Sequence, residues 1–97
     1  MGFQALATIK IMDYETPDFQ PRIFTGIRPI IRYEGMIGGS CALDLGDEKE
    51  AFPGETVEVG IDFLNPENHK PHMYVGLNFG LYAGNRKLAE GIINVLD

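Results

Sequence analysis

The chain has 97 residues, which is the length of one small folded domain. Hydrophobic residues make up 44% of it and charged residues 23%, a composition typical of globular rather than disordered proteins. It carries 14 acidic and 8 basic residues, and the net charge of -6 disfavours phosphate backbones as partners. The length excludes enzymes that need a nucleotide-binding domain beside a substrate domain, so we expect residues 1–97 to form one domain.

The compartment is indicated by one cysteine and by the N-terminal residues. Cys41 is the only cysteine, so no intrachain disulfide can form, which is typical of a reducing compartment. The first residues lack a basic start followed by a long apolar run, so we expect no signal peptide. No apolar stretch approaches the roughly 18–20 residues of a spanning helix. We therefore expect a soluble cytoplasmic protein with no membrane partner.

Alternation of apolar and polar residues predicts the first half of the fold. Residues 3–11 place apolar side chains at every odd position, as a strand with one buried face does. Residues 23–33 form a second predicted strand, which Pro29 puts at an edge or at a bulge because proline donates no ladder hydrogen bond. Residues 35–40 contain three glycines and are predicted as a flexible loop. A short strand at 41–45 and an acidic loop at 47–50 follow.

The second half shows the same period of two. Residues 56–63 follow a Pro53-Gly54 turn and alternate strictly, so they predict a strand. The polar stretch 67–71 is predicted as a loop, and residues 72–82 as another long strand. Gly84-Asn85 suits a tight hairpin turn before a last strand at 87–96, where a glycine and β-branched residues argue against a helix. Six short strands and no convincing helix predict an all-β fold, a small antiparallel barrel or sandwich.

Two sets of residues are candidates for a metal site or for catalysis. His69 and His72 have H-x-x-H spacing beside Glu67, but the prolines around them predict a loop with solvated histidines and no further ligand of the kind that zinc needs. Cys41 lies in an apolar run, where a free cysteine usually behaves as a small buried hydrophobe. We therefore expect no metal site and no catalytic cysteine.

Acidic pairs and glycines also give no catalytic or cofactor pattern. The carboxylates at positions 44, 47, 48 and 50 are adjacent in a predicted turn and lack the ligand spacing of calcium loops, so we expect a solvated acidic turn. The glycines at 35–39 lack the lysine and the following helix of a phosphate-binding loop. No cofactor is expected.

A basic segment is the most informative feature for function. Between Asp18 and Glu34 the chain has no acidic residue but three arginines and three aromatic residues: Arg22, Arg28, Arg32, Phe19, Phe24 and Tyr33. In a regular strand Arg28 and Arg32 point to the same side. Such a basic and aromatic stripe can recognise RNA phosphates or an acidic protein, or the arginines can pair with the chain's own surplus of carboxylates.

Four segments, taken in order, resemble one family. Residues 24–33 read FTGIRPIIRY and are similar to the F-x-G-Y-R-P-x-F-x-F strand of the third domain of translation elongation factor Tu. Residues 53–59, 76–82 and 84–93 resemble that domain's P-G-D-N-V-x-M segment, its G-L-R-F-A-I-R strand and its final G-G-R-T-V-G-A-G-V-V hairpin. The resemblance extends from about Phe3 to Leu96.

The resemblance implies a fold and a set of contacts. The family's third domain is a six-stranded antiparallel barrel that packs on a second barrel, contacts the GTPase domain and touches the T stem of aminoacyl-tRNA. By resemblance, Arg28 lies in a strand of the contact surface, and Arg86 and Gly91 match positions of the hairpin near the tRNA stem. The GTPase domain is absent from these residues, so no GTP hydrolysis is expected.

The leading expectation is a non-catalytic protein-interaction module related to translation, with an unidentified protein partner. Its binding surface is predicted to contain Arg22, Arg28, Arg32, Tyr33, Arg86 and Lys87. The alternative from another class is a tRNA-binding module that uses the same arginines, which the net charge disfavours. A small enzyme or metal protein is the third hypothesis. A homodimer formed through Leu6, Met12 and Tyr14 also stays open.

Overall fold

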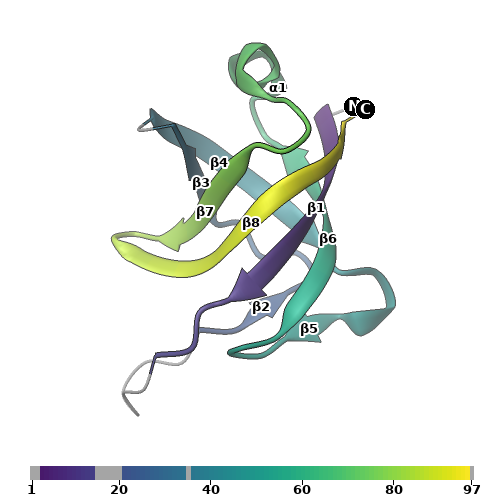
Figure 1. Cartoon of the computed structure of the whole chain (residues 1–97), viewed down its shortest axis with the longest axis vertical. Coiled ribbons are helices and arrows are strands. Elements are labelled where there is room, and N and C mark those ends of the chain that lie inside the picture. Colours follow the sequence, from purple (N-terminus) through teal and green to yellow (C-terminus); the bar gives the residue numbers. More distant parts are fainter. Residues whose placement is uncertain (1–2, 15–20, 35, 97) are drawn as a thin grey trace.

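Eight strands, one short α-helix and two 3₁₀ helices form the part of the chain that the computed structural model describes, residues 3–14, 21–34 and 36–96 (Figure 1). In chain order these elements are β1 Phe3–Ile11, β2 Ile23–Phe24, β3 Ile30–Tyr33, β4 Met36–Asp44, η1 Gly46–Glu48, β5 Glu50–Ala51, β6 Thr56–Phe63, α1 Pro66–His69, η2 Lys70–His72, β7 Asn78–Ala83 and β8 Arg86–Leu96.

Six of these strands close into an antiparallel barrel in the order β1-β6-β4-β3-β7-β8. Strand β1 pairs with β6 on one side and with β8 on the other, so the first and last strands of the barrel are joined. The predicted all-β fold and its small six-stranded antiparallel barrel are confirmed. Within the described residues, no helix is long and apolar enough to cross a membrane.

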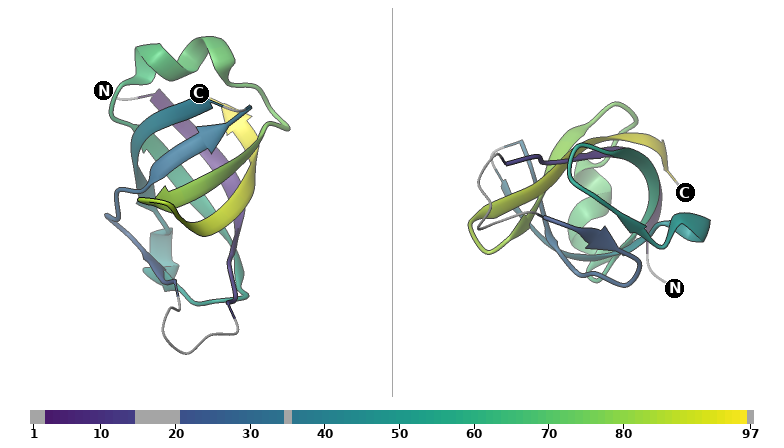
Figure 2. Two further views of the ribbon diagram at one scale, coloured as in Figure 1. Left: turned by 90° about the vertical axis from the view of Figure 1, so that its left-hand side faces the viewer. Right: turned by 90° about the horizontal axis from the view of Figure 1, so that it is seen from below.

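The two ends of the barrel are covered differently. The short strands β2 and β5 pair with each other at one end, and α1 with η2 lies across the other end (Figure 2). The prediction of a loop at 67–71 and of no helix is wrong here, because Pro66 begins a four-residue helix and Pro71 lies in the 3₁₀ turn that follows. A proline fits the first turn of a helix, where its missing N–H is not needed.

The strands that were predicted from strict alternation of apolar and polar residues are confirmed. Residues 3–11 and 56–63 are strands with the predicted bounds, and the last strand begins at Arg86, one residue early. Ala83 pairs with Arg86 across the two-residue turn at 84–85, where Gly84 has φ 61°. Glycine adopts this left-handed conformation without the steric cost that a Cβ would add.

The predicted strand at 23–33 is interrupted, which corrects the expected placement of the arginines. Gly26 has φ 95°, and the Ile27 N–H donates to the Phe24 carbonyl in a turn, so only β2 and β3 remain as strands. Arg28 lies between them in irregular backbone and not on the strand that carries Arg32. Arg28 and Arg32 therefore do not share a strand, so alternation along one strand no longer points both side chains to the same side.

The segment at 36–40 is part of β4 and not a flexible loop. An ideal Cβ on Gly38 would lie 2.0 Å from the carbonyl oxygen of Ile31, and one on Gly39 would lie 3.1 Å from Nε2 of His69. A Cβ has no room at Gly38 and would be in tight contact at Gly39, and composition alone does not distinguish such close approach from flexibility. The predicted loop residue Gly35 lies outside the described residues.

Two further predicted segments have different bounds. The predicted strand at 72–82 is a strand only from Asn78, because α1 and η2 precede a turn in which Leu77 N–H donates to the Tyr74 carbonyl. Gly76, with φ 96°, ends that turn. The predicted strand at 41–45 is the second half of β4, and the acidic loop at 47–50 contains η1 and the start of β5.

The core is formed by the inward positions of the strands. Alternate residues of β1 from Ala5 to Ile11 are buried, as are the odd residues of β6 from Val59 to Phe63. Cys41 is fully buried as predicted, its Sγ lies 3.7 Å from the Pro29 carbonyl oxygen, and burial raises the pKa of its thiol to about 12. Burial and a raised pKa are typical of a cysteine that packs as a small hydrophobic residue.

Gly91 lies where β8 crosses the core, and replacing it tests the packing. A Cβ there would lie 2.7 Å from Ile9 Cγ2, Phe79 Cζ and the Thr8 carbonyl oxygen, so Gly91→Ala is expected to reduce the free energy of unfolding by about 1–3 kcal/mol. Gly60→Ala is the matched control, because the nearest atoms to a Cβ there are 3.8 Å away and its stability is expected to be unchanged or higher. Urea denaturation measures both, and equal stabilities would contradict this packing.

Candidate groove on the outer face

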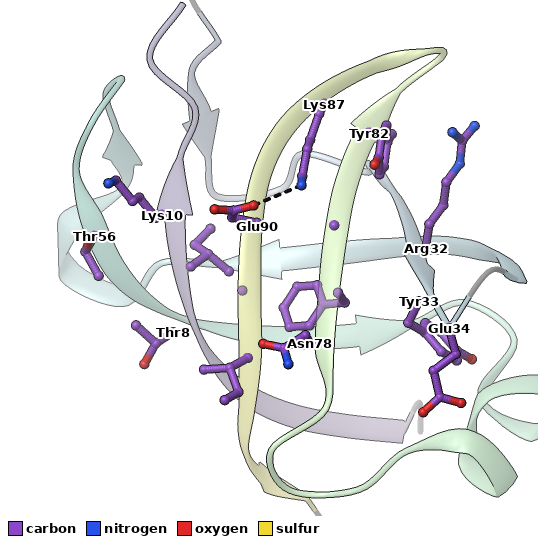
Figure 3. A pocket seen from close by; sticks show the side chains of 15 residues that line it. Thr8, Lys10, Arg32, Tyr33, Glu34, Thr56, Asn78, Tyr82, Lys87 and Glu90 are labelled. Atoms are coloured by element: carbon purple, nitrogen blue, oxygen red, sulfur yellow. Dashed lines mark hydrogen bonds and ion pairs between the residues drawn. The ribbon is translucent and has the colours of Figure 1, made fainter.

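An open groove of about 880 Å³ crosses the outer face of the barrel over β1, β8, β7 and β3 (Figure 3). Its floor follows from strand register: Arg32 pairs with Gly80, Gly80 with Glu90, Glu90 with Lys10, and Lys10 with Thr56. Directly paired residues point to the same side of a sheet. One row of outward side chains therefore spans five strands, and we call this feature the Arg32 groove.

Arg32 is held at one end of the Arg32 groove by an aromatic ring and by the backbone. Its guanidinium carbon lies 4.4 Å from the centre of the Tyr82 ring, and Nη2 donates to the Gly84 carbonyl oxygen at 3.2 Å. Gly80 makes room for that ring, because a Cβ there would lie 2.7 Å from Tyr82 Cε1. The cation–π contact and the hydrogen bond fix a planar donor group at the surface.

Part of the donor capacity of Arg32 is not used. Its Nε is buried and has no hydrogen-bond partner among the residues that the structure describes. Arginine has five N–H donors, and the contacts with Tyr82 and Gly84 hold the guanidinium of Arg32 in one orientation. An acceptor that reached its other nitrogens would therefore meet donors that are already oriented.

An ion pair occupies the middle of the Arg32 groove. Lys87 Nζ lies 2.9 Å from Glu90 Oε2 and donates a hydrogen bond to it. That bond lowers the pKa of the Glu90 carboxyl, which nearby Lys10 lowers further, and it raises the pKa of the Lys87 ammonium. Both side chains are partly exposed, so the pair adds little stability and a competing ion can displace it.

The lining carries a small excess of positive charge. Lys10, Arg32 and Lys87 stand against Glu34 and Glu90. Glu34 is already occupied, because Tyr74 Oη donates to its Oε1 at 2.7 Å. In a chain with net charge -6, the Arg32 groove is therefore a locally positive part of the surface.

The structure separates the predicted binding residues. Arg32 and Lys87 line the groove, whereas Arg22, Arg28 and Arg86 are exposed but do not line it. Tyr33, expected on the same surface, also lines the groove, although only 4% of its surface is exposed. Phe19, which was expected beside the arginines, lies outside the described residues. The segment thus contributes one arginine to the groove and not a stripe of three.

Sequence reasoning missed Lys10, Glu90 and Tyr82. All three occupy outward positions of strands whose alternation was recognised, so the outward parity was the available signal. Which outward residues meet depends on the pairing order of the strands, and the sequence does not show that order.

Of the residues proposed for a homodimer, Leu6 is exposed, whereas Met12 and Tyr14 lie after β1 ends and are half-buried. Tyr14 Oη donates to the Lys87 carbonyl oxygen at 2.7 Å, so its hydroxyl holds the chain against β8.

One histidine of the H-x-x-H pair is buried, which differs from the expectation of two solvated histidines. His69 is buried with 2% of its surface exposed, so it is not a solvated loop residue. Its ring stacks on Phe63 at 4.5 Å between centres, and its Nδ1 lies 2.9 Å from the Tyr33 hydroxyl. Its Nε2 is buried without a hydrogen-bond partner in the described part of the chain. His69 therefore attaches the α1–η2 segment to the end of the barrel.

The carboxylates of the predicted acidic turn are exposed and lie outside any candidate metal cluster of the described residues. Across residues 3–14, 21–34 and 36–96, no three His, Cys, Asp or Glu side chains gather to hold a metal ion. Asp44, Asp47, Glu48 and Glu50 are exposed, which confirms the predicted solvated acidic turn. Asp44 Oδ1 accepts from the Gly46 N–H at 2.8 Å, as residues that begin turns commonly do.

Comparison with known proteins identifies no family. No family model matches the sequence, and no curated protein matches it significantly.

Stability is expected to fall when the solution is acidified. Burial, and then the neighbouring His72, lowers the pKa of His69 below its ordinary 6.5, so the unfolded state binds more protons below that pH. The free energy of unfolding should decrease from about pH 7.5 to about pH 5.5, as urea denaturation at each pH measures. His69→Phe keeps a ring against Phe63 and should flatten this dependence, whereas the control His72→Gln should retain most of it, because burial is the larger cause. An unchanged pH dependence in His69→Phe would contradict the assignment.

Proposed function

We propose that this barrel is a non-catalytic protein-interaction module, and that it binds its partner through the Arg32 groove. The observation that carries the proposal is the fixed guanidinium of Arg32, held by Tyr82 and Gly84 at the end of a long open groove. A preorganised arginine beside an aromatic ring is a common anchor of protein interfaces, because little side-chain entropy is lost on binding. The resemblance to the third domain of elongation factor Tu favours a partner related to translation.

The partner is proposed to place a carboxylate on Arg32. Carboxylates accept two parallel hydrogen bonds from guanidinium groups, and Lys10 in the same row adds a second positive charge. Aliphatic and aromatic side chains beside this carboxylate would contact Tyr82 and the partly exposed Ile92. The proposed ligand is thus an acidic segment with apolar neighbours on a protein surface.

An RNA ligand is the alternative, and the charges of the groove favour it less. Glu90 lies in the middle of the row and Glu34 lines the groove, so a phosphate backbone would pass two carboxylates. Single anchoring groups suffice for a protein partner, whereas RNA affinity rises with the number of phosphates that are neutralised.

The proposal is tested by affinity capture with the full chain from extracts of its own cell. The wild type, Arg32→Gln and the control Arg28→Gln are compared after nuclease treatment. A protein partner is expected with the wild type and with Arg28→Gln but not with Arg32→Gln, because Arg28 is exposed outside the groove. Titration calorimetry with the purified partner should show a loss of about tenfold or more in affinity for Arg32→Gln.

Two outcomes would contradict the proposal. One is a set of partners that Arg32→Gln leaves unchanged. The other is tRNA binding at low salt that weakens by nearly a decade per decade of salt for each phosphate contacted, which would support the RNA alternative instead. Far-ultraviolet circular dichroism of Arg32→Gln confirms that any loss is not unfolding.

A further inference from the structure

A second hollow lies on the outer face, apart from the Arg32 groove. Across β8, β1, β6 and β4 the residues Val95, Leu6, Gly60 and Asp44 are paired in register, so they form one outward row. This row lies in a groove of about 410 Å³, which we call the Gly60 groove. Gly60 forms its floor because it has no side chain between Leu6 and Asp44.

A bulge creates the apolar part of the Gly60 groove. The register between β1 and β8 shifts between Leu6 and Ala7, so Leu6 pairs with Val95 but Ala7 pairs with Ile93. The extra residue is Asn94, whose Nδ2 donates to Thr8 Oγ1 at 2.6 Å. Regular alternation would turn Val95 inward with Ile93, but after the bulge it is exposed. Bulges commonly redirect side chains in this way beside functional sites.

The result is an exposed aliphatic pair. Leu6 has 54% of its surface exposed and Val95 has 50%, and the two are direct cross-strand neighbours. An ideal Cβ on Gly60 would lie 4.0 Å from Leu6 Cδ2, so the leucine side chain lies along the edge of the floor. A side chain from another molecule that entered over Gly60 would contact aliphatic carbon on one side.

The other side of the Gly60 groove is acidic. Asp44 and Glu58 line it, and none of its described lining residues is basic. Since Gly60 pairs with Asp44, Glu58 is the diagonal neighbour of Asp44, at a separation of roughly 7–8 Å. Asp44 uses Oδ1 for the Gly46 N–H, which leaves its second oxygen as an acceptor.

We propose that the Gly60 groove docks an extended basic segment of a partner protein, in which a lysine or arginine lies two residues after an aliphatic residue, so that both side chains point to the same face. The aliphatic side chain would pack on Leu6 and Val95 over Gly60, and the cation would lie between Asp44 and Glu58. Charge complementarity selects this occupant, and the net charge of -6 steers basic segments toward the chain. A second copy fits less well, because a symmetric contact would bring the carboxylates together.

The test uses the full ¹⁵N-labelled chain and a defined peptide. The probe is an acetylated and amidated heptapeptide with leucine and lysine at alternate odd positions and serine between them, compared with the same peptide in which glutamate replaces lysine. Titration of the lysine peptide is expected to shift the amide signals of Leu6, Gly46, Gly60 and Val95. The glutamate peptide is expected to leave these signals unchanged.

Two variants and one control locate the interaction. Asp44→Asn with Glu58→Gln should weaken binding of the lysine peptide by about tenfold, whereas Asp47→Asn with Glu48→Gln removes the same charge outside the groove and should change affinity little. Gly60→Val fills the floor with a side chain that points outward and should abolish binding, while the amide spectrum shows that the variant is folded.

Each opposite result overturns the proposal. It fails if the lysine peptide causes no shifts, if its shifts lie at residues outside the Gly60 groove, or if the glutamate peptide binds equally well. It also fails if the same amide signals shift with protein concentration alone, since a second copy would then occupy the groove. None of these outcomes depends on the Arg32 groove, so this test stands apart from the proposed protein-interaction function.

Discussion

Closure of the barrel through β1 is the constraint on which the rest of the structure depends. Because β1 pairs with β6 on one side and with β8 on the other, the barrel strands have no free edge along β1. Closure removes the unpaired N–H and C=O groups that would otherwise attract other strands. Another chain therefore cannot extend this barrel by adding a strand beside β1.

Closure also determines which side chains meet on that face. Each row of paired residues carries outward side chains from consecutive strands, and a residue without a side chain makes a hollow in its row. Gly80 lies in the row of Arg32 and Lys10, and Gly60 lies in the row of Leu6 and Val95. One groove has a positive excess and the other carries only acidic charged groups. A chain with net charge -6 thus presents two faces of opposite polarity.

Much of this fold follows from local sequence patterns, because an inward and outward alternation is imposed on each strand separately. Strands with strict alternation, such as 56–63, were predicted to the residue. The errors arose where distant groups decide the local structure. The local sequence predicts a flexible loop at Gly38 and Gly39, because it does not show that the Ile31 carbonyl and His69 lie against them. The local sequence also predicts a solvated His69, because it does not show that the histidine ring stacks on Phe63. The Arg32 groove needs strand order, so only two of its charged residues, Arg32 and Lys87, were named from sequence.

The most specific feature of the Arg32 groove is the difference between two arginines four residues apart. Gly26 and Pro29 interrupt the predicted strand, so Arg28 stays exposed in irregular backbone while Arg32 is held by Tyr82 and Gly84. Side-chain ¹⁵Nε relaxation measures directly whether the Arg32 guanidinium is immobilised. We expect an order parameter above about 0.8 for Arg32 and below about 0.6 for Arg28. An Arg32 side chain as mobile as that of Arg28 would contradict it.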